Sequence, residues 1–207
     1  AGADAAKFQH FSAKSIVIAA GAGSFVPRRP PLEGIEEFED KSIFYAVRNK
    51  SKFKDKKILI VGGGDSALDW TNDLSSIANV TLMHRRKDFR ASPDSVSKML
   101  ELETDNKINF KLGQLTQLVG VNGKLTKVKY KNEDEESEIE VDYLLPFFGL
   151  KMELGPIANW GLNLDKNLIK VDTEKFETST SSIFAIGDIN TYPGKLKLIL
   201  SGFHEAA

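Results

Sequence analysis

A glycine-rich turn is the first stretch of the chain whose residue types and spacing indicate chemistry. Gly62, Gly64 and Ala67 fit the G-x-G-x-x-G/A pattern of turns that bind dinucleotides. In such a turn the first glycine permits a sharp bend, and the second lets the backbone approach a pyrophosphate. The small third residue lets the following helix pack close to the preceding strand. We therefore predict that this turn binds a nucleotide cofactor.

The predicted contacts come from the turn and from the start of the helix after it. They are Gly62, Gly63, Gly64, Asp65, Ser66 and Ala67. The first turn of a helix presents free N–H groups and the positive end of the helix dipole, and both favour a phosphate. The side chains of Asp65 and Ser66 could either cap the helix or contact the ligand.

A basic cluster follows at the position that distinguishes NAD from NADP. An NAD site usually has an acidic residue about 20 residues past the glycines, where it binds the ribose 2′-hydroxyl. The chain here reads His84, Arg85, Arg86, Lys87, Asp88, Phe89 and Arg90. Guanidinium groups offer planar, paired donors that match a phosphate. We predict NADP(H), with Arg85, Arg86 and Arg90 around the 2′-phosphate. His84 would flank that phosphate, and Asp88, which comes too late for the ribose role, would orient an arginine.

These residues need two strands and a helix to hold them. Residues 58–61 form a continuous apolar run rich in β-branched side chains, which is typical of a parallel strand buried on both faces. Apolar residues between Ala67 and Ile77 recur at helical spacing, and residues 80–83 form a second apolar run. The alternative is a structural turn followed by a solvated basic loop. The combination of strand, turn, helix and basic cluster favours the cofactor site.

A second helix is predicted after the basic cluster. Ser92 and Pro93 are typical of an N-cap and a first helical position. Val96, Met99 and Leu100 would form the buried stripe of this helix.

The segment that follows predicts a small antiparallel meander laid across the parallel sheet. Asn122 and Gly123 are typical of a two-residue hairpin turn. Residues 127–131 and 139–143 alternate between polar and apolar side chains, which indicates half-buried strands.

Near the C-terminal end, residues 183–186 form an apolar strand that ends in Gly187 and Asp188. By composition alone, an aspartate at this place is more often a cap or a turn residue than a ligand-binding residue. One face of a following helix is predicted to consist of Leu196, Ile199, Leu200 and Phe203.

Composition excludes several classes of function. A net charge of −1 and a pI near 6.4 give no support to general nucleic-acid binding. No apolar run approaches the length of a membrane span, and no signal peptide is visible. The chain has no cysteine, which excludes thiolate metal sites and redox-active cysteine pairs, and its three histidines lack metal-ligand spacing. With a need for NADP(H), these features lead us to expect a cytoplasmic protein.

Four groups of residues are specific in combination. They are Gly62 to Trp70; His84-Arg85-Arg86 with Phe89-Arg90; Gly155-Pro156-Ile157 with Asn159-Trp160-Gly161-Leu162; and Phe184 to Asp188 with Gly194-Lys195 and Gly202-Phe203. With these residues, the chain resembles flavin- and NADP-dependent reductases of the thioredoxin-reductase fold, within the class II pyridine nucleotide-disulfide oxidoreductases. It is most similar to the bacterial ferredoxin–NADP reductases of the thioredoxin-reductase-like type.

The resemblance implies an α/β fold with a Rossmann-like NADP-binding domain. That domain, with its parallel sheet, helices and small antiparallel meander, would be inserted into an FAD-binding domain that is incomplete here. Residues 1–27 would end the first FAD segment, residues 28–149 would form the NADP domain, and residues 150–207 would belong to the second FAD segment.

The resemblance also implies residues that contact the flavin. Asp188, beside Gly187, would accept a hydrogen bond from a ribityl hydroxyl of FAD, and Phe25 would lie close to the flavin. The N-terminus of the following helix, near Lys195 to Lys197, would face the flavin N1 and O2 region and favour negative charge there.

Two departures from the family pattern matter. Thioredoxin reductases carry a Cys-x-x-Cys pair where this chain has residues 45–49, which contain no cysteine, so disulfide reduction through that pair is impossible. The glycine fingerprint that binds the FAD pyrophosphate has no match either. We therefore expect a fragment that keeps the NADP site and loses much of its FAD affinity.

The implied activity is electron transfer between NADP(H) and ferredoxin, or a similar small iron–sulfur protein, by way of FAD. Hydride would pass between the nicotinamide C4 and the flavin N5, and no residue needs to act as a general acid or base. The resemblance suggests a homodimer with no nucleic-acid or membrane partner. Two alternatives stay open: an NADP-binding module without turnover, and a diaphorase with another acceptor.

Overall fold

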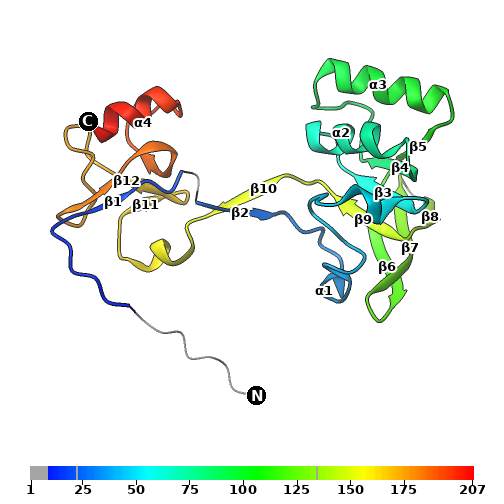
Figure 1. The fold of residues 1–207 in the computed structure, drawn as a ribbon, viewed down its shortest axis with the longest axis horizontal. Helices are drawn as coiled ribbons and strands as arrows, with labels where there is room; N and C mark the ends of the chain where they lie inside the picture. The colour runs from blue at the N-terminus through cyan, green and yellow to red at the C-terminus, as the bar shows by residue number, and fades with distance from the viewer. Residues whose placement is uncertain (1–8, 22, 134) are drawn as a thin grey trace. The chain divides into compact units, whose positions relative to one another are not determined.

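The computed structural model describes residues 9–21, 23–133 and 135–207, and the chain divides into two compact units. One unit, called unit 1 here, contains the described residues up to Val26 together with Lys151–Ala207. The other, unit 2, contains Pro27–Leu150. The chain leaves unit 1 along strand β2 (Ser24–Pro27) and returns along β10 (Leu150–Glu153), and these two strands are hydrogen-bonded neighbours (Figure 1).

Unit 2 is built on a parallel sheet of four strands in the order β5-β4-β3-β9. Their bounds are β3 (Lys57–Val61), β4 (Asn79–His84), β5 (Ile108–Leu112) and β9 (Tyr143–Pro146), and every pair in the sheet is parallel. Leu59 and Val61 pack into one apolar cluster, while Ile58 and Ile60 pack into another. The apolar run is continuous because successive side chains of β3 enter cores on opposite faces of the sheet.

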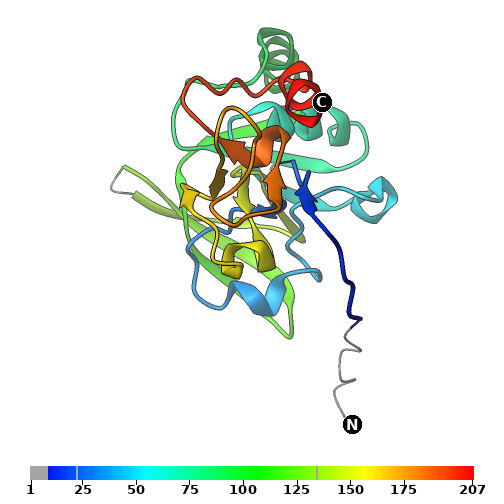
Figure 2. The same ribbon diagram turned by 90° about the vertical axis from the view of Figure 1, so that its left-hand side faces the viewer.

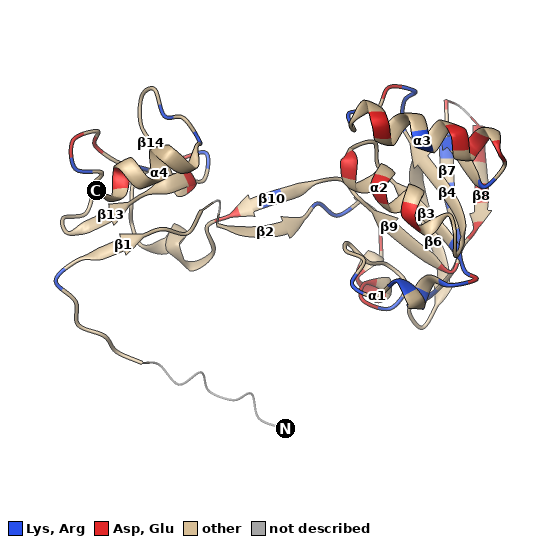
Figure 3. Ribbon diagram, turned by 45° about the horizontal axis from the view of Figure 1, so that its top comes forward, with Lys and Arg blue, Asp and Glu red and all other residues tan. Residues whose placement is uncertain are grey.

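Helices α2 (Asp65–Leu74) and α3 (Pro93–Thr104) pack into one of these cores. As predicted, Ser92 caps α3: its Oγ accepts a hydrogen bond from the Ser95 backbone N–H at 3.3 Å, and Pro93 occupies the first helical position. The solvent side of α3 carries both acidic and basic residues (Figure 3). Two short helices, α1 (Ile35–Phe38) and η1 (Lys50–Phe53), precede the sheet in the chain.

The predicted buried stripe of α3 needs a correction. Met99 is fully buried and Val96 is partly buried, but Leu100 is 48% exposed. Leu100 lies one position round the helix from Met99, which rotates its side chain out of the core.

The opposite face of the parallel sheet carries a meander of three antiparallel strands. They are β6 (Gln114–Val121), β7 (Lys124–Asn132) and β8 (Glu135–Glu140). The predicted turn is confirmed, because Asn122 and Gly123 have φ angles of 56° and 77°, and two positive φ angles favour a tight hairpin between twisted strands. Val128 and Leu125 of β7 share a core with Leu59 of β3. Unit 2 is therefore a three-layer α/β structure, as the sequence predicts.

Unit 1 contains short strands and one longer helix, α4 (Ile199–Ala206), drawn in red in Figures 1 and 2. Strand β1 (Ile16–Ile18) pairs in parallel with β13 (Ile183–Ala185). Strand β12 (Leu168–Lys170) lies between β11 (Leu164–Asp165) and β14 (Asn190–Thr191). Two 3₁₀ helices complete the unit, η2 (Gly155–Asn159) and η3 (Gly187–Ile189).

The predicted apolar face of the last helix needs a correction at Leu196, while Ile199, Leu200 and Phe203 do share one face of α4. Leu196 precedes α4, which begins only at Ile199. Ile199, Leu200 and Phe203 are 83%, 77% and 73% exposed, whereas the buried residue of this helix is Glu205. The helix thus turns a carboxylate inward and its apolar side chains outward. Among the described residues, no helix is long and apolar enough to cross a lipid bilayer.

The different burial of two neighbours in α3 gives a stability prediction. Met99→Ala should lower the free energy of unfolding of unit 2 by about 2–5 kcal/mol, because it leaves a cavity in a closed core. Leu100→Ala should lower it by less than about 1 kcal/mol, since the side chain is largely in water. Chemical denaturation monitored by Trp70 fluorescence in a Trp160→Phe background measures both; similar losses would contradict the burial of this stripe.

Candidate functional site

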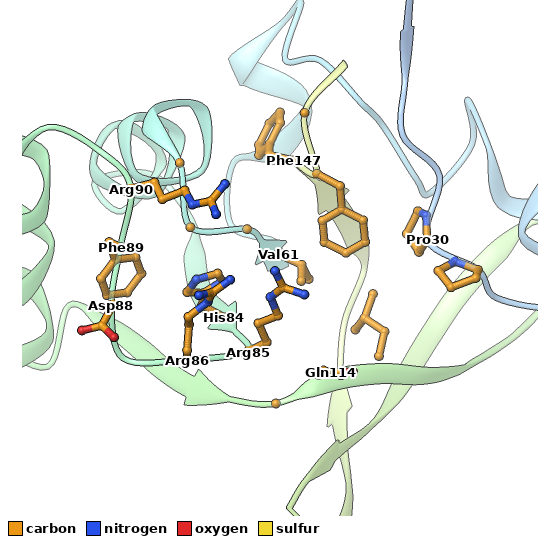
Figure 4. Close-up of a pocket in the computed structure, with 18 residues that line it drawn as sticks. Pro30, Val61, His84, Arg85, Arg86, Asp88, Phe89, Arg90, Gln114 and Phe147 are labelled. Atoms are coloured by element: carbon orange, nitrogen blue, oxygen red, sulfur yellow. The ribbon is translucent and has the colours of Figure 1, made fainter. Parts of the chain in front are cut away.

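A pocket of about 730 Å³ opens in unit 2 at the carboxyl end of the parallel sheet (Figure 4). A glycine turn and an arginine loop form its polar walls. The apolar residues that line it are Pro30, Pro31, Val61, Phe89, Leu115, Phe147 and Phe148. A volume of this size suits a small ligand or cofactor, and apolar walls with a few polar groups are usual in such sites.

The pocket lies where the strand order of the sheet reverses. From β3 the chain continues to β4 and β5 on one side, while β9 pairs with the other side of β3. The backbone N–H of Gly62 donates to the Met83 carbonyl at 3.0 Å, and the N–H of Phe147 donates to the Val61 carbonyl at 2.8 Å. In open α/β sheets, ligands bind in the crevice at such a reversal.

The glycine turn contains two glycines that the protein itself requires. A Cβ on Gly62 would lie 2.6 Å from the Phe147 carbonyl oxygen and 3.0 Å from the Cβ of Ala67. A Cβ on Gly63 would overlap the ring of His84. Ala67 is fully buried, so a small residue is needed there for α2 to approach β3.

Gly64 differs from its two neighbours. A Cβ on Gly64 would meet no protein atom within 4 Å, and its φ and ψ of −105° and 179° suit any residue. Neither packing nor backbone conformation explains a glycine here. The space beside it opens into the pocket, where a bare backbone admits a ligand at close range.

The first turn of α2 begins at this glycine without a side-chain cap. The side chain of Asp65 does not cap the helix; its Oδ1 accepts a hydrogen bond from the backbone N–H of Ser92 at 2.7 Å. Ser66 is exposed. Helix geometry leaves the N–H groups of Asp65 and Ser66 without intrahelical acceptors, so they are free to donate to an anion. The side chains of Asp65, Ser66 and Ala67 do not line the pocket.

Arg85, Arg86 and Arg90 all line the pocket. In the described part of the chain, none of the three forms an ion pair with an acidic residue. The backbone N–H of Arg90 donates to the Gly63 carbonyl at 2.7 Å, which joins the arginine loop to the glycine turn. The site therefore holds three arginines that form no ion pair with an acidic residue of the described chain.

The expected role of Asp88 is wrong. Asp88 lines the pocket, but its carboxylate makes no hydrogen bond or ion pair with an arginine among the described residues. Figure 4 shows it directed away from the guanidinium groups of Arg85 and Arg90. The loop turns between these residues, so closeness in sequence does not produce contact.

His84 lies between the glycine turn and the arginine loop, with its ring beside Gly63 and Phe89. Its ring stacks on Phe89 with centroids 5.4 Å apart and an interplanar angle of 27°. Burial lowers the pKa of His84; the nearby Arg86, Arg85 and Arg90 lower it further, and a hydrogen bond to the Asp88 backbone opposes them. A neutral imidazole between the glycine turn and the arginine loop fixes their relative position.

Several pocket residues were missed from the sequence. Pro30 and Pro31 lie between β2 and α1, and Phe147 and Phe148 follow β9, in stretches that carry no sequence marker of ligand contact. Gln114 and its neighbours carried a usable signal: they follow β5, and residues after parallel strands gather at one edge of a sheet.

The other predicted site residues belong to unit 1. Gly187, with φ of 77°, opens η3 after β13. Asp188 is half-buried, and its carboxylate has no hydrogen bond or ion pair in the described chain. Phe25 on β2 is 56% exposed. The described residues contain no group of three or more His, Asp or Glu suited to a metal ion.

The expectation for the helix near Lys195 needs correction. Helix α4 begins at Ile199, with Leu198 at its N-cap. Lys195 lies in an irregular segment before it, and its ammonium group is buried in an ion pair with Glu205.

Comparison with known proteins gives a consistent picture. The family model described as pyridine nucleotide-disulphide oxidoreductase matches residues 3–206. A protein named ferredoxin–NADP reductase from Beijerinckia indica is 62% identical over 198 residues, which are 95% of this chain and 58% of that relative. Its namesake from Parvibaculum lavamentivorans is 62% identical over 199 residues, with the same coverage. The chain thus spans less than two thirds of the length of these relatives.

Solved structures show the same fold. The thioredoxin reductase of Lactococcus lactis has a TM-score of 0.72 and 26% identity, over 96% of this chain and 64% of that one. The thioredoxin reductase of T. acidophilum has a TM-score of 0.70 and 26% identity, over 94% of this chain and 63% of that one.

The glycine turn yields a matched pair of substitutions. Gly63→Ala should destabilise unit 2 by about 1–3 kcal/mol, because the new methyl group overlaps an imidazole ring held by Phe89. Gly64→Ala should cost less than about 1 kcal/mol, the usual cost of alanine at an N-cap. Urea denaturation followed by Trp70 fluorescence, with Trp160 replaced by Phe, measures each; a larger loss for Gly64→Ala would contradict the open space beside it.

The environment of His84 predicts how stability depends on pH. A histidine whose pKa is lower when folded makes a contribution that is fully present above the unfolded pKa, about 6.5, and is lost as pH falls toward the folded pKa. The free energy of unfolding of unit 2 should therefore decrease between about pH 7 and pH 5 more steeply in the wild type than in His84→Gln. Denaturant titrations at several pH values give both slopes, and equal slopes would exclude this contribution.

Proposed function

The chain belongs to the pyridine nucleotide-disulphide oxidoreductase family, and from this premise we propose that it is part of a reductase that transfers electrons between NADP(H) and ferredoxin through FAD. In this proposal unit 2 binds NADP(H), and unit 1 supplies part of the FAD site. The three arginines without ion-pair partners beside the glycine turn are the observation that carries the proposal.

The cofactor of unit 2 follows from the charge of its pocket. An adenine dinucleotide with a 2′-phosphate brings two negative charges that NAD lacks, and Arg85, Arg86 and Arg90 are available to bind them. Asp88, the acidic residue in the lining, faces away from the arginines and would not repel that phosphate. The site thus favours NADP(H) over NAD(H).

The pyrophosphate fits the glycine turn. The open space beside Gly64 can accommodate the pyrophosphate, and the N–H groups of Asp65 and Ser66 can donate hydrogen bonds to it. Gly62, Gly63 and Ala67 act indirectly, since their small size lets the turn and α2 approach β3. His84 keeps the arginine loop against the turn and has no catalytic role in this proposal.

In unit 1, Asp188 is the proposed acceptor for a ribityl hydroxyl of FAD. A half-buried carboxylate without a partner is suited to accept hydrogen bonds from a polyol. Gly187 brings the backbone of the turn close to the ligand, and Phe25 offers an exposed aromatic ring. When bound, the nicotinamide supplies a hydride and the flavin divides the two electrons into single-electron steps.

The acceptor is proposed to be ferredoxin or a similar iron–sulfur protein. The chain has no cysteine, so the disulfide chemistry in the family's name cannot proceed through this chain's own side chains. The relatives cited above are named ferredoxin–NADP reductase, which supports a one-electron acceptor. Steady-state assays with ferredoxin, quinones and dyes as acceptors distinguish this reductase from a diaphorase.

Two further attributes belong to the same proposal. A cytoplasmic location agrees with dependence on NADP(H), and a homodimer agrees with the family resemblance. Fractionation and sedimentation test them separately. Bound FAD in a purified preparation separates the reductase from the alternative of an NADP-binding module without turnover.

The arginine assignment gives a direct test of cofactor choice. Arg85→Ala combined with Arg86→Ala should weaken NADPH binding by roughly 1–3 kcal/mol for each lost charged contact and should affect NADH binding far less. Fluorescence titration of both nucleotides measures the two dissociation constants.

A matched control removes two positive charges elsewhere in unit 2. Arg48 and Lys54 are exposed and lie outside the pocket lining. The Arg48→Ala, Lys54→Ala variant should bind NADPH nearly as well as the wild type. Equal losses for NADPH and NADH in the arginine variant would refute the phosphate assignment, and an equal loss in the control would reduce it to a general effect of net charge.

A further inference from the structure

Glu205 is the only acidic residue among those described that is buried. The residue is 5% exposed and its side chain is fully enclosed. A carboxylate removed from water costs much free energy unless several donors surround it. Its partners therefore reveal what the buried charge does for the fold.

Four donors converge on this carboxylate. Oε2 accepts hydrogen bonds from the backbone N–H of Gly187 at 2.7 Å and from Nδ2 of Asn190 at 2.9 Å. Oε1 accepts from the hydroxyl of Tyr192 at 2.8 Å and from the ammonium group of Lys195. Both oxygens are fully used, and Lys195 balances the charge.

The charge is retained at neutral pH. Burial alone would raise the pKa of Glu205, but the hydrogen bonds from Lys195, Gly187 and Tyr192 outweigh burial and hold that pKa below its usual range. Glu205 is therefore a permanent acceptor, so its bond to the Gly187 N–H persists across the physiological range.

The bond to Gly187 reaches the turn that carries Asp188. Gly187 has φ of 77°, in the left-handed region, and begins η3. Asn190 extends the network, because its Nδ2 also donates to the Ala185 carbonyl at the end of β13. Helix α4 touches the turn a second time, since a Cβ on Gly202 would lie 3.4 Å from the Gly187 Cα. One carboxylate thus fixes the turn at both of its ends.

We propose that Glu205 is a positioning residue that holds the Gly187–Ile189 turn in the conformation that presents Asp188 to its ligand. The contrast between the two carboxylates supports this: Glu205 is saturated with donors, whereas Asp188, on the turn it fixes, has none among the described residues. The identity of the ligand as FAD rests on the proposed function; the positioning role does not.

A competing explanation is that Glu205 merely neutralises Lys195. Two double variants separate the explanations, because both remove the charged pair and differ only in the acceptor. Glu205→Gln with Lys195→Met keeps an amide oxygen that can accept from Gly187. Glu205→Leu with Lys195→Met has a similar volume and no acceptor, and replacing a buried ion pair with apolar residues is often tolerated.

The first measurement is amide hydrogen exchange at Gly187 in the ¹⁵N-labelled 207-residue chain. The Leu/Met variant should exchange about tenfold faster or more, because a buried N–H without an acceptor loses protection. The Gln/Met variant and Tyr192→Phe, which removes only one bond to Oε1, should stay within about threefold of the wild type. Equal exchange in both double variants would overturn the positioning role.

A second comparison applies if the Leu/Met variant loses protection throughout β1 and β13, which would indicate global unfolding. In Glu205→Gln alone, Lys195 competes for the single oxygen, so exchange at Gly187 should accelerate. Adding Lys195→Met should restore its protection, and a failure to restore it would equally contradict the proposal.

Ligand binding is the second readout. FAD affinity should fall about tenfold in the Leu/Met variant and recover in the Gln/Met variant, while NADP⁺ affinity of unit 2 stays unchanged. Unchanged FAD affinity in the Leu/Met variant would contradict the proposal. A wild-type chain that binds neither FAD nor NADP⁺ would contradict the proposed function instead, and exchange at Gly187 would then decide the positioning role by itself.

Discussion

Backbone hydrogen bonding at the end of β3 is the constraint on which unit 2 depends. The Gly62 N–H binds the carbonyl of Met83 on one side, and the Val61 carbonyl binds the N–H of Phe147 on the other. Because Met83 belongs to β4 and Phe147 follows β9, these two bonds place the end of β3 between both neighbours, where the strand order reverses. The glycine turn, the arginine loop after β4 and the phenylalanines after β9 therefore meet around one space. No side chain has to create this meeting, because parallel pairing already brings the carboxyl ends together.

The three glycines of the turn differ in what surrounds them. Gly62 and Gly63 are small because protein atoms occupy the place of a side chain, whereas Gly64 is small beside open space. Packing explains the first two, whereas the third is an N-cap residue beside open space, where a bare backbone also admits a ligand. The same distinction applies to charge: most of the lysines that form ion pairs do so at the surface, while three arginines in the pocket do not. Such unsatisfied capacity is the physical sign of a binding site.

Local pattern predicted the parts of the fold that depend on neighbouring residues in sequence. The strand at 58–61, the cap at Ser92 and the turn at Asn122 each follow from a few adjacent residues, and the structure confirms them. The arginines could be assigned to the same pocket as the glycine turn because their distance from the glycines is set by one helix and one strand. Prediction failed where partners are remote. The hydrogen-bond donors to Glu205 come from the segment before α4, and helical periodicity gives no sign that the charged face is the buried one. The prediction that Asp88 orients an arginine was wrong because residue spacing does not determine the path of a loop.

Helix α4 has an unusual polarity, with Glu205 enclosed and Ile199, Leu200 and Phe203 each at least 73% exposed. Water in contact with such hydrocarbon is displaced more readily as temperature rises or as sulfate and phosphate salts are added. The only Asp, Glu, Lys or Arg residue of α4 is the buried Glu205. The exposed side of the helix therefore carries no such charge that would repel another copy of the chain. Added sulfate or phosphate should therefore favour contact between copies of the chain through this apolar surface.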